Sequence, residues 1–137
     1  MTIWHTFEQL HDQGLVKCLG ISNIYDLDLL KRIWDEARVK PSVVQNRFYR
    51  STGFDQDIRQ FCLGVGIHYQ SFWTLTANPE ILANPHFRAI TSRYQATQAQ
   101  IFYRFVMALG ICPLSGTKND LHMKQDLEVV DIPLTAE

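Results

Sequence analysis

The chain has 137 residues, of which 46% are hydrophobic, so it is long enough for one domain with a real core and is not expected to be disordered. Its 13 basic and 14 acidic residues give a net charge of −1 without a basic run, which argues against nucleic acid or an anionic membrane as a partner. No apolar run approaches the roughly 18 residues of a membrane-spanning helix, and Met1 to Leu10 read as an amphipathic helix rather than a signal peptide, so we expect a cytoplasmic protein.

The first part of the chain alternates helix and strand. We expect a first helix from Ile3 to Gln13, with Ile3, Phe7 and Leu10 on its apolar face, Trp4 and His11 beside that face, and Gly14 as its left-handed stop. A nearly all-apolar strand follows from Val16 to Ile21, as in a sheet covered on both faces. Asp26 then opens a second amphipathic helix, Leu27 to Ala37.

The same alternation continues through the middle of the chain. A second strand is expected from Ser42 to Phe48. A third helical stripe begins near Phe54, and either Gly64 or Gly66 ends it. Ile67 to Trp73 is the third strand, although its polar residues make the alternation imperfect.

The last part begins with a long segment, residues 74 to 95, in which Pro79 and Pro85 each suit the start of a short helix. Thr97 is a good cap for the amphipathic helix that follows. A fourth strand is expected from Ile111 to Leu114. A tight loop leads from it to a final helix, capped by Asn119 or Asp120 and running from Leu121 to about residue 127. The tail from 128 to 137 shows no strong period.

Strands that alternate with helices through short loops indicate right-handed βαβ units and a parallel sheet. We therefore expect an α/β fold with about four parallel strands and about five helices, in a single domain over residues 1–137. A complete (β/α)₈ TIM barrel usually needs about 250 residues. The pattern predicts half of such a barrel.

Six short motifs in a fixed order carry a family resemblance. They are Gly14-Leu15-Val16-Lys17, Gly20-Ile21-Ser22-Asn23, Pro41-Ser42-Val43-Val44-Gln45-Asn46, Gly66-Ile67 with Ser71-Phe72-Trp73-Thr74-Leu75, Thr97-Gln98-Ala99-Gln100 with Arg104, and Cys112-Pro113-Leu114-Ser115-Gly116-Thr117 with His122-Met123. Together they resemble the C-terminal half of the aldo-keto reductase barrel, from the approach to its fifth strand to the helix after its eighth. They cover nearly the whole chain.

The resemblance implies a nicotinamide dinucleotide, NADP or NAD, as cofactor. In the family, side chains that match Ser22, Asn23 and Gln45 hydrogen-bond the nicotinamide carboxamide. The chemistry is consistent, because an amide ligand needs both donors and acceptors. The alternative is that Ser22 and Asn23 only cap the next helix.

Aromatic residues at the end of the third strand belong to the same implied site. Phe72 matches a tyrosine that stacks on the nicotinamide ring, and a phenyl ring keeps that stacking face. Trp73 replaces a small residue and narrows the channel beside the cofactor, with Leu75 next to it. The alternative for Phe72 is a core aromatic without a ligand.

The loop Ser115-Gly116-Thr117 leads into a helix N-terminus, where backbone N–H groups and the helix dipole favour an anion. The family places a phosphate of the adenosine side here. Many members carry a lysine at the position of Leu114 and an arginine near Asp120. Those two departures weaken the grip on a 2′-phosphate unless Lys118 and Lys124 compensate, so NADPH and NADH both remain open. A plain helix cap is the alternative.

The resemblance implies an NAD(P)H-dependent carbonyl or alcohol oxidoreductase. The family's catalytic tyrosine, lysine, aspartate and histidine sit on earlier strands, which would lie before Met1. We therefore assign no catalytic residue and expect the chain alone to be inactive, as a truncated protein. Two alternatives remain: a non-catalytic half-barrel that binds or scaffolds, and a small enzyme of different chemistry that reuses the pocket.

Other reactive side chains give weaker indications. The five histidines show no paired spacing with cysteines or carboxylates, so no metal site is expected. Cys18, Cys62 and Cys112 are odd in number and lie in apolar segments, which favours buried reduced thiols.

Charged residues outside the motifs receive structural interpretations. Asp55 and Asp57 are interpreted as a solvated helix start rather than an acid/base pair. Arg47 and Arg50 are interpreted as isolated surface charges.

An open half-barrel would leave two apolar edge strands and an uncovered face. We therefore expect a homodimer or a complementing half-barrel as the protein partner. A small carbonyl compound is the substrate that the resemblance implies.

Overall fold

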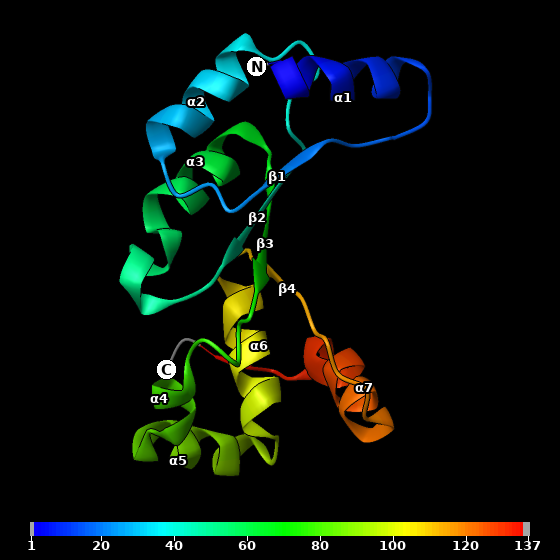
Figure 1. Ribbon diagram of the computed structural model, residues 1–137. Coiled ribbons are helices and arrows are strands. Elements are labelled where there is room, and N and C mark those ends of the chain that lie inside the picture. Colours follow the sequence, from blue (N-terminus) through cyan, green and yellow to red (C-terminus); the bar gives the residue numbers. More distant parts are fainter. Residues whose placement is uncertain (1, 136–137) are drawn as a thin grey trace. The chain divides into compact units, whose positions relative to one another are not determined.

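The computed structural model describes residues 2–135 and alternates helices with short strands along the chain (Figure 1). The helices are α1 (Thr2–Asp12), α2 (Leu27–Glu36), α3 (Gln56–Val65), α4 (Pro79–Ala83), α5 (Pro85–Tyr94), α6 (Gln98–Ala108) and α7 (Asp120–Leu127). The strands are β1 (Gly20–Ser22), β2 (Val43–Arg47), β3 (His68–Phe72) and β4 (Cys112–Pro113), and two 3₁₀ segments are η1 (Arg50–Asp55) and η2 (Glu128–Asp131).

The four strands form one parallel sheet in the order β1-β2-β3-β4, as the alternating pattern predicted. In the β1–β2 ladder Gly20 lies opposite Val43 and Ser22 lies opposite Gln45. A Cβ atom on Gly20 would come within 3.0 Å of the Val43 carbonyl oxygen, so this close approach requires glycine.

The first and last strands are shorter than expected. Residues 16–19 precede the β1 ladder, which begins only at Gly20. In β4 the second of the two residues is Pro113, which has no N–H to donate to a ladder. Strand length here depends on the neighbouring strand and not only on apolar sequence.

The residues gather into two compact units. The first contains the residues up to Asn46 together with Ser51–Gln70, and the second contains Arg47–Arg50 and the chain from Ser71 onward. Both β2 and β3 therefore contribute residues to both units.

In the first unit, α1 is fixed to the segment that follows α2. The indole N–H of Trp4 donates to the carbonyl of Val39 at 3.1 Å. Oε1 of Glu8 accepts from the backbone N–H groups of Arg38 (2.7 Å) and Val39 (2.9 Å). Trp4 also packs with buried Leu19 in the core of this unit.

These contacts change which face of α1 is buried. Trp4 and Glu8 are buried, whereas Ile3 is 72% exposed and Phe7 is 41% exposed. The prediction that Ile3 and Phe7 form the buried face was therefore wrong, and Trp4, which was placed beside that face, is the buried aromatic. Glu8 turns inward because its carboxylate pairs two backbone N–H groups that would otherwise lack partners.

In the second unit, α6 carries the core. Its start is a capping box, in which Thr97 Oγ1 accepts from the backbone N–H of Gln100 and the Gln100 side chain accepts from the N–H of Thr97. Phe102 is buried against Phe48 and Phe87, with ring centroids 6.4 and 6.1 Å away. The predicted cap at Thr97 is confirmed.

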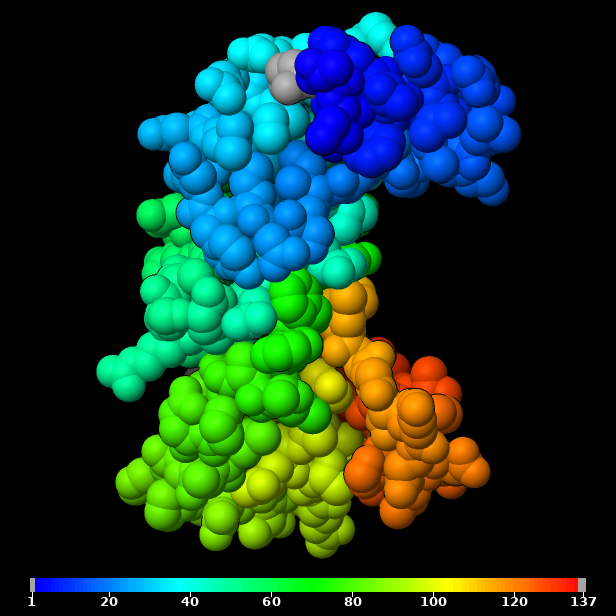
Figure 2. Space-filling view, in the orientation of Figure 1, coloured from blue at the N-terminus to red at the C-terminus, as the bar shows by residue number. Residues whose placement is uncertain are grey.

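The C-terminal segment packs on α6 through η2. Val129 is buried, and Arg104 donates to the carbonyl of Ile132 at 2.8 Å. The tail thus contains an ordered 3₁₀ segment that its sequence did not indicate. Helix α7 buries no residue and stands on the surface of this unit, orange in Figure 2.

Helix starts and stops follow the sequence signals. Asp26 accepts from the N–H of Leu29, and Asn119 accepts from the N–H of His122. Gly66, rather than Gly64, ends α3 in the left-handed conformation. Each cap or stop depends on residues close in the sequence, which explains why it could be predicted.

All three cysteines are free, but the expectation that all are buried was wrong. Cys62 is buried, and desolvation raises the pKa of its thiol to about 11. Cys18 and Cys112 are exposed, because one precedes the β1 ladder and the other lies on the two-residue strand β4.

Two further observations concern residues 2–135 alone. They contain no helix that is both long and apolar enough to cross a membrane. They contain no group of three or more His, Cys, Asp or Glu side chains placed to hold a metal ion.

Candidate functional site

In the first unit, the structure brings together Ser22, Asn23 and Gln45. The hydroxyl of Ser22 donates to the carbonyl of Gln45 at 3.0 Å, and the backbone N–H of Asn23 donates to the same carbonyl at 3.1 Å. The side-chain amide of Asn23 donates to Ser22 Oγ at 3.1 Å. We refer to these three residues as the amide cluster.

The amide cluster is not used to cap α2, because Asp26 fills that role. Ser22 and Asn23 are exposed, so their remaining donors and acceptors face solvent. Asn23 has a φ of 58°, a left-handed conformation that asparagine tolerates better than most residues. The capping alternative for these two residues is therefore wrong.

Gln70 also belongs to this region, although it was not predicted from the sequence. Gln70 Oε1 accepts from the side-chain amide of Gln45 at 3.0 Å and so fixes its orientation. Gln70 lies two positions before Phe72 on β3 and therefore points to the same face of the sheet. The alternation of side chains along β3 was the sequence signal that could have identified Gln70.

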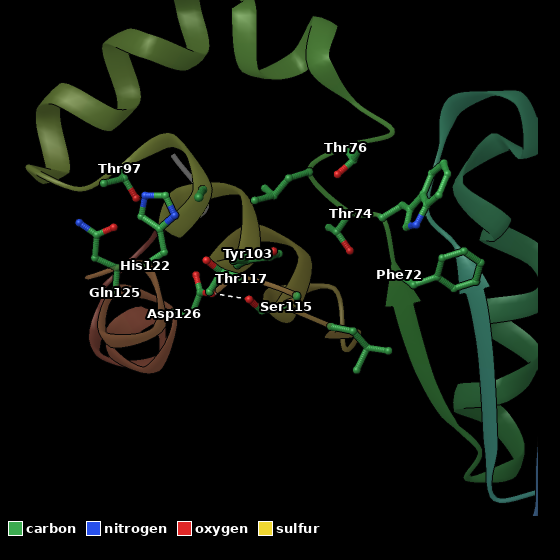
Figure 3. A pocket seen from close by; sticks show the side chains of 15 residues that line it. Phe72, Thr74, Thr76, Thr97, Tyr103, Ser115, Thr117, His122, Gln125 and Asp126 are labelled. Atoms are coloured by element: carbon green, nitrogen blue, oxygen red, sulfur yellow. Dashed lines mark hydrogen bonds between the residues drawn. The ribbon is translucent and has the colours of Figure 1, made fainter. Parts of the chain in front are cut away.

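The second unit contains a cavity of about 580 Å³, shown in Figure 3. It is bounded by the residues that end and follow β3, by the start of α6, by the loop after β4 and by α7. Six of the nine expected cofactor residues line it, namely Phe72, Trp73, Leu75, Ser115, Gly116 and Thr117.

Hydroxyl groups and one carboxylate form the centre of the cavity wall. Ser115 donates a hydrogen bond to Asp126, and Tyr103 and Thr117 lie beside this pair (Figure 3). Burial raises the pKa of Tyr103, and the charge of Asp126 raises it further. The phenol therefore stays protonated at neutral pH.

The cavity wall carries a negatively charged side chain and no lysine or arginine. Among the residues that line it, Asp126 is the only Asp, Glu, Lys or Arg. Lys118 and Lys124 are outside the lining, and Lys124 lies 3.9 Å from the carboxylate of Glu128. Neither lysine lines the cavity, and their compensation for the missing cations stays a prediction.

Trp73 is held in an unusual conformation at the edge of this cavity. Its φ is 54°, and its side chain is 55% exposed. The guanidinium carbon of Arg47 lies 4.3 Å from the indole centroid and 5.4 Å from the ring of Tyr49. Arg47 was wrongly interpreted as an isolated surface charge, because it stacks between two aromatic rings.

Asp55 was also misinterpreted. It is only 4% exposed, and its carboxylate accepts hydrogen bonds from Asn46 and Tyr69. Asp57 is exposed, as expected for a solvated helix start.

Comparisons with known proteins give consistent matches. A family model described as the Aldo/keto reductase family matches residues 1–137. The (1S)-1,7-diacetoxy-luvungin A aldo-keto reductase of Citrus sinensis is 27% identical over 144 residues, which cover 98% of this chain and 44% of that protein. The uncharacterized oxidoreductase YtbE of Bacillus subtilis (strain 168) is 26% identical over 135 residues, covering 98% and 47%.

Solved structures match at the level of the fold. An aldo-keto reductase of the silkworm Bombyx mori superposes with a TM-score of 0.84 at 23% identity, over 97% of this chain and 43% of that one. An aldo-keto reductase complexed with NADPH superposes with a TM-score of 0.81 at 20% identity, over 97% and 43%.

The chain thus spans about half the length, or slightly less, of the relatives it matches. With four parallel strands that alternate with helices, the fold is half of a (β/α)₈ barrel, which confirms the fold class predicted from the sequence.

Proposed function

The chain belongs to the aldo/keto reductase family, and we propose that it is the dinucleotide-binding half of an NAD(P)H-dependent carbonyl or alcohol oxidoreductase. The observation that carries this proposal is the cavity of the second unit, where residues from three separate motifs line one space. Its volume of about 580 Å³ is typical of ligand pockets in proteins.

The lining of the cavity suits part of a dinucleotide. Phe72 and Leu75 offer apolar surface for a planar ring, and Ser115 and Thr117 offer hydroxyl groups for polar atoms. We propose that the loop from Ser115 to Thr117 contacts the phosphate and adenosine side of the cofactor.

The amide cluster of the first unit supports the second part of the proposal. Ser22 and Asn23 are exposed, and together with Gln45 they present both donors and acceptors. We propose that these three side chains hold the carboxamide of the nicotinamide.

A bound nicotinamide would supply the hydride, and the residues described above would bind and orient it. The resemblance places the family's catalytic set on earlier strands, so we propose that the proton donor and its partners come from the other half of a complete barrel. That half would also cover the open face of the sheet. The free thiols fit a reducing compartment, and we propose the cytoplasm as the location.

A fluorescence titration with NADH and NADPH tests the proposal. We expect saturable binding, and we expect Phe72→Ala to weaken it about tenfold because a stacking surface is lost. Phe105→Ala is the matched control, since Phe105 lies on the exposed side of α6 and does not line the cavity. Absence of saturable binding would favour the non-catalytic scaffold instead, and equal losses in both variants would place the ligand elsewhere.

A further inference from the structure

A buried carboxylate is connected by hydrogen bonds, through Asn46, to the residue that follows the amide cluster. Asp55 stands at the N-terminus of α3, yet its side chain does not cap that helix. A single oxygen, Oδ2, instead accepts from the side-chain amide of Asn46 at 2.7 Å and from the hydroxyl of Tyr69 at 2.8 Å. All three residues are at most 4% exposed.

Asn46 connects this carboxylate to the loop between β1 and α2. Its Oδ1 accepts from the backbone N–H of Ile24 at 2.9 Å, and its Nδ2 donates to the carbonyl of the same residue at 2.6 Å. Asn46 is fully buried and Ile24 is 5% exposed. One side chain therefore satisfies both backbone polar groups of Ile24, the residue directly after Asn23.

The carboxylate reinforces the orientation of the Asn46 amide that the N–H and carbonyl groups of Ile24 already select. An ionised carboxylate only accepts hydrogen bonds, so it must face Nδ2. If the amide turned over, Oδ1 would face a carboxylate oxygen and Nδ2 would face the N–H of Ile24. Both contacts would be repulsive in a site without water to relieve them.

The backbone at Asp55 is strained. Phe54 and Asp55 have φ values of 55° and 52°, in the left-handed region that non-glycine residues rarely adopt. Such strain persists where the surrounding contacts determine the conformation, and it gathers at functional sites. Two hydrogen bonds to a buried charge are contacts strong enough to hold it.

We propose that Asp55 is a positioning residue for the amide cluster. It acts through Asn46 and Ile24 to keep Asn23 in the left-handed conformation in which its side chain bonds Ser22. The role in holding a nicotinamide carboxamide rests on the proposed function. The proposed control of the loop between β1 and α2 is independent of that function.

The structural arm of the test measures amide hydrogen exchange in Asp55→Asn, which keeps the shape of the side chain and removes its charge. Exchange at Ile24 should rise about tenfold, because the Asn46 amide loses its charged acceptor and holds the backbone of Ile24 less firmly. Asp57→Asn is the matched control, since it removes a neighbouring charge that is exposed. Equal exchange at Ile24 in both variants contradicts the proposal.

Two further measurements distinguish a local effect at Ile24 from general loosening or misfolding of the variant. The amide of Ala37, bonded to the carbonyl of Ile33 in the same unit, should exchange at the wild-type rate. A parallel rise at Ala37 and Ile24 would mean general loosening and would overturn the proposal. If Asp55→Asn does not fold, Tyr69→Phe is the second variant. It removes one of the two hydrogen bonds that hold the Asp55 carboxylate against Asn46, so Ile24 exchange should rise about threefold, and an unchanged rate contradicts the proposal.

The ligand arm separates the two ends of the dinucleotide. In Asp55→Asn, affinity for reduced nicotinamide mononucleotide should fall about tenfold, whereas affinity for ADP-ribose should stay at the wild-type value. Equal losses for both ligands, or no loss for either, would overturn the positioning role. If wild-type protein binds neither ligand, the proposed function fails, and the exchange at Ile24 still decides whether Asp55 controls the loop.

Discussion

A single carboxylate sets the charge of the cavity in the second unit. Asp126 accepts from Ser115, whose backbone starts the loop proposed to meet a phosphate. The family resemblance places Leu114 at a position where many members carry a lysine and Asp120 near one where they carry an arginine. We therefore expect a dinucleotide with an additional 2′-phosphate to meet a less favourable field than NADH does.

Removal of that charge should change cofactor preference. In Asp126→Asn we expect NADPH affinity to rise about threefold to tenfold, with a smaller rise for NADH, because one negative charge near the phosphates is gone while an acceptor for Ser115 remains. Parallel titrations at low and physiological salt measure this. Asp131→Asn, on η2 and outside the cavity lining, is the control. An unchanged NADPH to NADH ratio would show that the phosphate lies elsewhere.

Residues whose roles depend on local motifs were predictable, and residues whose roles depend on distant partners were not. Phe72 and Ser115 sit in motifs that resemble a known family, and both line the cavity. Asp55 was interpreted as a solvated helix start because its partner Tyr69 lies on β3, in another element of the chain. Its burial follows from tertiary packing, which the spacing of charges in one segment does not reveal.

At the scale of elements, Glu8 connects α1 to the end of α2. The hydrogen bond with His5, followed by those from the backbone of Val39 and Arg38, lowers the pKa of Glu8 from 4.5 to about 2. A carboxylate with a lowered folded-state pKa stabilises the fold above its unfolded-state pKa. That contribution is lost as the pH falls from about 4.5 through about 2.

Thermal unfolding of Glu8→Gln should therefore depend less on pH than unfolding of the wild type. We expect the melting temperature of the variant to be lower by on the order of 5 °C at pH 7 and to approach that of the wild type near pH 2. Glu36→Gln, an exposed residue at the end of α2, should behave as the wild type at both pH values. Parallel pH profiles for the wild type and Glu8→Gln would contradict this account of α1.

Helix boundaries were easier to predict than strand boundaries or helix faces. Thr97 and Asn119 cap helices through contacts within three residues, so the sequence contained the whole signal. The buried face of α1 depends on backbone N–H groups at Arg38 and Val39, far along the chain. The length of β1 likewise depends on where β2 runs beside it.

At the scale of the molecule, the strand order places β1 and β4 at the two edges of an open sheet. A half-barrel without its counterpart leaves such edges available for pairing. We propose that a second copy, or a chain that supplies the other half of the barrel, covers them.

Light scattering of the purified chain at micromolar concentration tests this proposal. We expect a mass at least twice that of one chain, because a two-fold pairing of half-barrels would satisfy both edges. A monodisperse monomer that unfolds cooperatively would show that the chain covers its own open face.

A map of backbone amide chemical shifts during titration with NADH tests dinucleotide binding by this half-barrel most directly. We expect saturable changes at Ser22, Asn23 and Gln45 in the first unit, and at residues 72–76 and 115–117 in the second. Changes absent from both regions, or confined to the surface of η1 and the start of α3, would contradict the claim that this half-barrel binds a nicotinamide dinucleotide.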